Sequence, residues 1–174
     1  MLTTLLALIA LPPPLLIPPA ARAAELLASV LFVAILISAT KHDLATLRIP
    51  DRVIVPGTAA IGAILLLATV ISGDWHPFNN ALIGATGAAA FYLTLHVIAK
   101  DGIGFGDVKF AVVIGLITGW HSPVAALIAP IAAFTTAGFA VIVLLLTRQI
   151  NRKTQMPLAP WMALGAVASL ATSF

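Results

Sequence analysis

Two aspartates at the edges of apolar stretches are the residues whose type and spacing could do chemistry. Asp43 ends one such stretch, and Asp107 opens another within the run GIGFGDVK at residues 102–109. Two carboxylates brought together where water is scarce cannot both ionise cheaply, so they share a proton. Such a pair lets one member activate water while the other polarises a carbonyl group. On spacing alone, the alternative that each aspartate caps a helix or pairs with Lys41 or Lys109 stays open.

The other four of the six acidic residues do not indicate catalysis. Asp51 follows Pro50 and is predicted to N-cap a helix that begins near Val53. The remaining three are predicted to lie in solvated turns or at a helix end: Glu25, Asp74 and Asp101.

Three glycines precede Asp107 within five residues: Gly102, Gly104 and Gly106. Glycine permits backbone conformations closed to other residues, so this segment could let an extended substrate backbone lie beside Asp107. The alternative is a flexible loop or close helix packing. The glycines do not follow the P-loop or dinucleotide-binding pattern, so we do not expect nucleotide binding.

The histidines do not indicate a metal site. They stand at positions 42, 76, 96 and 121, without metal-ligand spacing, so neither metal nor cofactor is expected. His42 is the histidine beside a catalytic candidate, and we interpret it as an interfacial residue rather than a proton shuttle.

The elements that must position these residues are membrane helices. Hydrophobic residues make up 61% of the 174 residues and charged residues only 9%, which a soluble domain of this size could not accommodate. With no cysteine, disulfides, a zinc ribbon and a thiol nucleophile are excluded. No basic stripe interleaved with aromatic residues is present, so nucleic acid is not an expected partner.

The apolar stretches lack a period of two, which favours helices over a membrane barrel. The prediction is an all-α polytopic membrane protein with a six-helix core, at about 24–40, 53–72, 78–99, 108–121, 123–147 and 156–174. Residues 24–174 form the membrane domain, and residues 1–23 form an irregular, proline-rich hydrophobic segment that would make a seventh span if residues 2–20 cross the bilayer. Gly115 and Gly119 offer a GxxxG face for close helix packing.

Basic residues orient these helices. Eight of the nine lie in alternate loops, which places those loops and both aspartates on the cytoplasmic side: Lys41, Arg48, Arg52, Lys100, Lys109, Arg148, Arg152 and Lys153.

Three blocks of sequence resemble one family, the type IV prepilin peptidases (the A24 GxGD aspartic membrane proteases). The run GFGDVK at 104–109 resembles the family's GxGD signature. Asp43 with RIPD at 48–51 is similar to its first aspartate and the turn that follows. MPLAPWMALGA at 156–166 is similar to its last-helix segment. The blocks occur in the family's order and cover about residues 30–166.

The resemblance implies an endopeptidase of the plasma (inner) membrane that removes short basic leaders from prepilins, pseudopilins or Flp-type precursors at the cytoplasmic face. It implies Asp43 and Asp107 as the catalytic pair, with substrate-binding or supporting roles for Gly104, Gly106, Lys109, Arg48 and Pro50. The bifunctional members carry a CxxC domain and methylate the new pilin N-terminus. The absence of cysteine makes this chain resemble the short, peptidase-only branch, such as the enzymes of tight-adherence pilus systems or the archaeal preflagellin peptidases.

The helix ends suggest the roles within the pair. Asp107 at a helix N-terminus is predicted to be the resting base, and Asp43 at a helix C-terminus the resting acid.

The rival interpretation is a small transport or assembly protein that is non-catalytic or relays protons through these carboxylates. A presenilin-like protease also uses GxGD, but the RIP turn and the lack of a tyrosine before Asp43 argue against it.

Overall fold

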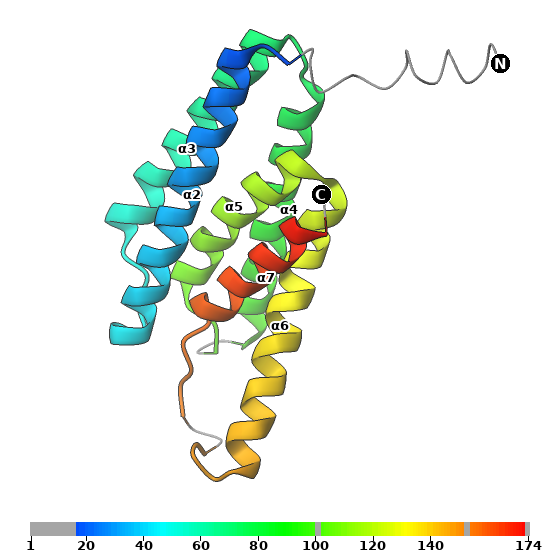
Figure 1. Cartoon of the computed structure of the whole chain (residues 1–174). Helices are drawn as coiled ribbons and strands as arrows, with labels where there is room; N and C mark the ends of the chain where they lie inside the picture. The colour runs from blue at the N-terminus through cyan, green and yellow to red at the C-terminus, as the bar shows by residue number, and fades with distance from the viewer. Residues whose placement is uncertain (1–16, 100–101, 152–153, 173–174) are drawn as a thin grey trace, which may run out of the picture.

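Helices form all the regular structure in the part of the chain that a computed structural model describes, residues 17–99, 102–151 and 154–172. Six helices follow one another in this part (Figure 1): α2 (Pro19–Thr46), α3 (Asp51–Ser72), α4 (His76–Ala99), α5 (Phe105–His121), α6 (Pro123–Leu146) and α7 (Ala159–Ala171). By length and composition α2, α3, α4 and α6 can cross a membrane, whereas α5 and α7 have 17 and 13 residues. The predicted all-α, polytopic membrane architecture is confirmed.

The first described helix begins earlier than predicted. Pro18 is the N-cap of α2 and Pro19 its first residue, because proline suits the first turn of a helix, where the missing N–H would have no partner. The helix ends at Thr46, and Leu47 follows in the left-handed conformation with φ 54° and donates its N–H to the Asp43 carbonyl. Most of the predicted proline-rich segment, residues 1–16, lies outside the described residues.

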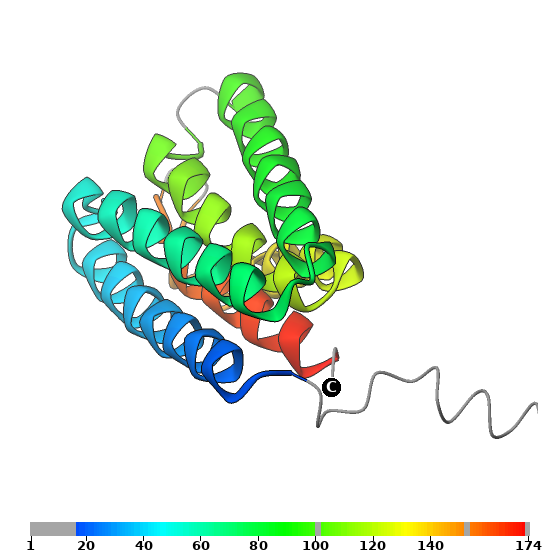
Figure 2. The ribbon, with the colours of Figure 1, turned by 90° about the horizontal axis from the view of Figure 1, so that it is seen from above.

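Helix α5 lies at the centre of the bundle, as the view from above shows (Figure 2). Twelve of its 17 residues are buried, and α4 packs along it most closely. A Cβ on Gly115 would collide with the Gly84 carbonyl oxygen, and one on Gly119 with the Asn80 carbonyl oxygen. The predicted GxxxG packing face is therefore confirmed: it lets the backbones of α4 and α5 approach directly.

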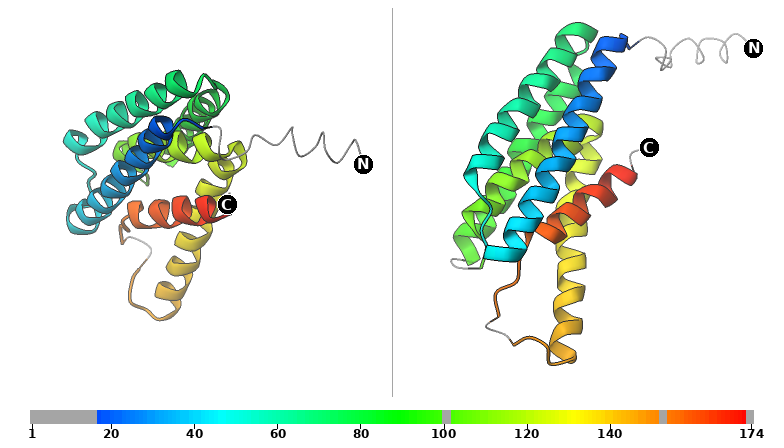
Figure 3. Two further views of the ribbon diagram at one scale, coloured as in Figure 1. Left: turned by 45° about the horizontal axis from the view of Figure 1, so that its top comes forward. Right: turned by 60° about the vertical axis from the view of Figure 1, so that its left-hand side comes forward.

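Helices α6 and α7 form the other side of the bundle. Gly165 on α7 faces the backbone of Ala129 and Ala133 on α6, so these helices also approach without intervening side chains. Figure 3 shows α6 extending past the first residues of α7, while the start of α7 lies near the end of α2. Successive helices alternate in direction, which gathers the ends of α2, α4 and α6 and the starts of α3, α5 and α7 at one end of the molecule.

Candidate active site

The two predicted aspartates meet at this end of the bundle. Asp43 lies in the last turn of α2 and Asp107 in the first turn of α5, with exposed fractions of only 5% and 9%. Their carboxyl groups are close enough to interact electrostatically. Since burial and a neighbouring like charge both disfavour a second anion, the site favours a pair that holds one proton.

Asp43 is held by the start of a helix that is distant in sequence. Its Oδ2 accepts a hydrogen bond from the Ala159 backbone N–H at 2.8 Å, and the Leu158 N–H also donates to this carboxylate. Leu158 is the N-cap of α7 and Ala159 its first residue. A carboxylate at this position satisfies N–H groups that the first turn of a helix leaves unpaired. The third sequence block therefore supplies the backbone donors that orient Asp43.

Asp107 is held by its own loop. Its Oδ2 accepts the Gly104 N–H at 3.0 Å, and its N–H donates to the Gly104 carbonyl, also at 3.0 Å. This reciprocal pair of bonds caps α5. A Cβ on Gly104 would lie 3.3 Å from Asp107 Oδ2, so glycine leaves the carboxylate room to fold back over its own loop.

The predicted division of roles between the aspartates loses its basis here. It rested on Asp43 lying at a helix C-terminus, but the Asp43 carboxylate is also at the N-terminus of α7. Both carboxylates thus face the positive end of a helix. Asp43 accepts two backbone N–H groups from α7 and Asp107 accepts one from Gly104. Hydrogen bonds to a carboxylate stabilise its ionised form, so the donors favour Asp43, rather than Asp107, as the anion.

Gly106 packs against the turn between α2 and α3. A Cβ there would lie 3.3 Å from the Ile49 Cβ and 3.6 Å from its backbone N and O. Ile49 is buried, whereas the Arg48 side chain is exposed, and Pro50 is the N-cap of α3. Gly106 therefore packs the Asp107 loop closely against the turn that follows α2. Its role here is close packing, the alternative to admitting an extended substrate backbone.

Lys109 contacts both of these segments. Its Nζ donates to Asp51 Oδ2 at 2.7 Å and lies 5.0 Å from the centre of the Phe105 ring. The prediction that Asp51 caps α3 is wrong: Asp51 is the first residue of the helix, and no side chain caps it. Since Lys109 lies two residues beyond Asp107, this ion pair fastens the start of α3 beside the Asp107 loop.

Sequence reasoning missed two neighbours of the aspartates. Ala159 acts through its backbone N–H, so its residue type gives no signal. Tyr92 on α4 is buried and close enough to interact electrostatically with Asp107. The sequence signal for it was that it is the chain's single tyrosine.

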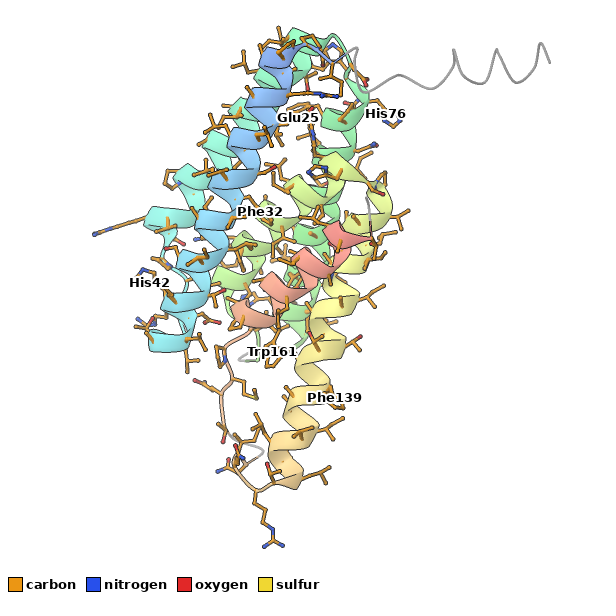
Figure 4. All side chains as sticks on the ribbon, viewed as in Figure 1. Glu25, Phe32, His42, His76, Phe139 and Trp161 are labelled. Atoms are coloured by element: carbon orange, nitrogen blue, oxygen red, sulfur yellow. The ribbon has the colours of Figure 1, made fainter. Side chains whose placement is uncertain are left out.

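His42 is exposed, whereas Trp161 in the first turn of α7 is half-buried (Figure 4). Among the described residues, no group of three potential metal ligands occurs.

Comparison with known proteins agrees with the family resemblance of the sequence motifs. The model of the Type IV leader peptidase family matches residues 30–146. A prepilin leader peptidase/N-methyltransferase of Bacillus subtilis (strain 168) is 30% identical over 146 residues, covering 82% of this chain and 54% of that protein. Proteins of the same name from Pseudomonas putida and Aeromonas salmonicida (strain A449) are each 27% identical, covering 74% and 83% of this chain and 43% and 48% of their own lengths.

The chain thus spans about half the length of the curated relatives it matches. No solved protein structure matches it.

Proposed function

Because this chain belongs to the type IV leader peptidase family, we propose that it is a membrane aspartic endopeptidase of the plasma (inner) membrane. Its substrates are type IV prepilin-like precursors, namely pilins, pseudopilins or Flp-type pilins. It removes their short basic leader at the cytoplasmic face. Only the peptidase half of the relatives' name is assigned, because two carboxylates account for hydrolysis and for nothing else in that name.

The observation that carries the proposal is the meeting of Asp43 and Asp107. They are 64 positions apart in sequence, yet both are buried at one end of the bundle, with their carboxyl groups close enough to interact electrostatically. A membrane protein avoids burying two carboxylates together without a use, because each disfavours the other's charge. Acid–base work on one water molecule is such a use.

The donors around the pair suggest its division of labour. In the proposed reaction Asp43, the ionised member of the pair, keeps its hydrogen bond from the Ala159 N–H and takes a proton from water as the oxygen attacks the scissile carbonyl carbon. Asp107 gives its proton to the carbonyl oxygen. When the tetrahedral intermediate collapses, the C–N bond breaks, the proton on Asp43 passes to the leaving amine, and the carbonyl-oxygen proton returns to Asp107. The pair ends as it began, with one proton shared.

The charge distribution supports the proposed cytoplasmic side of the membrane. Lys41, Arg48 and Arg52 lie exposed around the α2–α3 turn, at the same end as the aspartates. An excess of basic residues is typical of cytoplasmic loops. Acidic lipids attracted to this surface would also attract a basic leader.

The test is leader removal by the purified protein in detergent or nanodiscs, with a panel of pilin-like precursors and mass spectrometry of the products. We expect one cleavage just after the basic leader, abolished in Asp43→Ala and in Asp107→Ala. Asp74→Asn, an exposed carboxylate at the opposite end of the bundle, is the matched control and should cleave normally. Failure to cleave any pilin-like precursor would overturn the proposal and favour a transport or assembly role.

A further inference from the structure

A side chain from α4 contacts the loop that presents Asp107 and restrains it. His96, in the last turn of that helix, bonds through Nδ1 to the Ile103 carbonyl at 2.7 Å. A carbonyl oxygen only accepts, so Nδ1 carries the proton. The same imidazole lies against the Phe105 ring, with the ring centres 5.8 Å apart. One side chain therefore holds both the backbone and the aromatic residue of this loop.

A second restraint on the loop comes from an ion pair with α3. The Lys109 ammonium lies 5.0 Å from the centre of the Phe105 ring and donates to Asp51 at 2.7 Å. The contacts run without a break from His96 on α4, through Phe105 and Lys109 on α5, to Asp51 on α3. Phe105 is 51% exposed, so it adds little to the core, and its ring serves chiefly to join the His96 and Lys109 side chains to the loop.

These contacts surround a segment whose own residues do little to restrict its backbone conformation. Gly102, Gly104 and Gly106 give the loop more conformational freedom than any other residue type would. Yet the Asp107 carboxylate takes its orientation from this loop, through the Gly104 N–H. Packing of Ile49 at Gly106 restrains only the end of it. Something outside the loop must reduce its freedom if Asp107 is to stay in place.

We propose that His96, Phe105, Lys109 and Asp51 form a brace that positions the Asp107 carboxylate for the reaction. The inference rests on the proposed function for its kinetic consequences, but the brace itself is a structural claim. Its members are positioning residues. Among the described contacts, none of their side chains bonds to the Asp43 or Asp107 carboxylate.

The kinetic test uses conservative rescue. His96→Ala removes the donor, whereas His96→Asn places an amide N–H where Nδ1–H was. We expect kcat to fall about tenfold in His96→Ala with KM nearly unchanged, because misplacing a catalytic group slows chemistry rather than binding. His96→Asn should recover most of kcat. His76→Ala, at the other end of α4, is the matched control. Equal losses in the alanine and asparagine variants of His96 would overturn its part in the brace.

The ion pair allows a charge exchange. Asp51→Lys and Lys109→Asp should each lower kcat by about tenfold, and the double variant, which restores the pair in reverse, should recover much of the loss. A double variant as slow as the product of the single losses would show that these residues act independently, against the brace.

Hydrogen exchange separates this inference from the proposed function. In His96→Ala and Asp51→Lys the amides of residues 102–107 should exchange at least about fivefold faster, while those of α6 keep the wild-type rate. This result would support the brace even if the wild-type protein cleaved no precursor. Unchanged exchange in that segment would overturn the brace even if wild-type cleavage were established.

Discussion

Replacing Asp43 separates its structural contribution from its chemistry. Asp43→Ala removes the acceptor for the Ala159 N–H, a 2.8 Å bond. Ala159 is 0% exposed, so water cannot replace the lost partner. Losing a helix N-cap or leaving a buried donor unpaired each costs about 1–2 kcal/mol, and because these are one event we take about 2 kcal/mol in total. For a chain of this length that lowers the melting temperature by about 4–8 °C.

Asp43→Asn should behave differently because its side-chain oxygen still accepts the α7 amides. We expect it to melt within about 3 °C of the wild type, yet to cleave precursor no better than Asp43→Ala, since an amide cannot serve as the base. Thermal unfolding in detergent, followed by tryptophan fluorescence, measures the first effect; Trp161 in α7 reports on the affected helix.

Asp74 supplies the control for these thermal unfolding measurements. It accepts the His76 N–H at 2.9 Å, a similar contact at the exposed far end of the bundle, where water replaces a lost partner. Its alanine variant should therefore melt close to the wild type and cleave normally. If Asp43→Ala melted with the wild type, or if the asparagine and alanine variants of Asp43 melted alike, the account of α7 capping would be refuted.

Three further outcomes follow from the packing and the chemistry. Gly106→Val should lower both stability and cleavage, because its side chain would push the Ile49 turn away from the Asp107 loop; melting and activity assays on one preparation check this. Gly115→Ala should destabilise by about 1–3 kcal/mol by colliding with the Gly84 carbonyl, whereas Gly138→Ala, which meets open space, should be neutral or slightly stabilising; opposite ranking of their melting temperatures would contradict the packing. A chelator should leave cleavage unchanged, because a two-carboxylate mechanism needs no metal; loss restored by a divalent ion would argue for a metalloprotease.

Much of this arrangement could be predicted from the sequence because charge is scarce in it. The apolar stretches between charged loops located the six helices, with the largest displacements at α2, which begins five residues before and ends six residues after the predicted stretch. Alternation of basic loops put Asp43 and Asp107 at the same end of the bundle, where the structure also places them. The glycine pair at 115 and 119 predicted a direct backbone contact, since only a residue without Cβ permits it.

The partners of the aspartates could not be predicted, because they are backbone atoms or depend on tertiary packing. The Ala159 N–H would be offered equally by other residue types at that position. The helix that carries Asp43 is visible in the sequence, whereas the docking of α7 on the Asp43 carboxylate depends on tertiary packing. For the same reason the sequence predicts a local capping role for Asp51, whereas its partner, Lys109, is 58 residues away.

The central claim is that Asp43 and Asp107 act as one catalytic unit, and the most direct measurement is kcat/KM for Asp43→Asn, Asp107→Asn and the double variant. Each retains an amide oxygen for the backbone donors, so folding is preserved while acid–base function is lost. Each single change should lower kcat/KM by about 10³-fold or more, and the double variant should be no slower than the worse single one. A single variant that kept wild-type activity, or losses that multiplied in the double variant, would contradict the account.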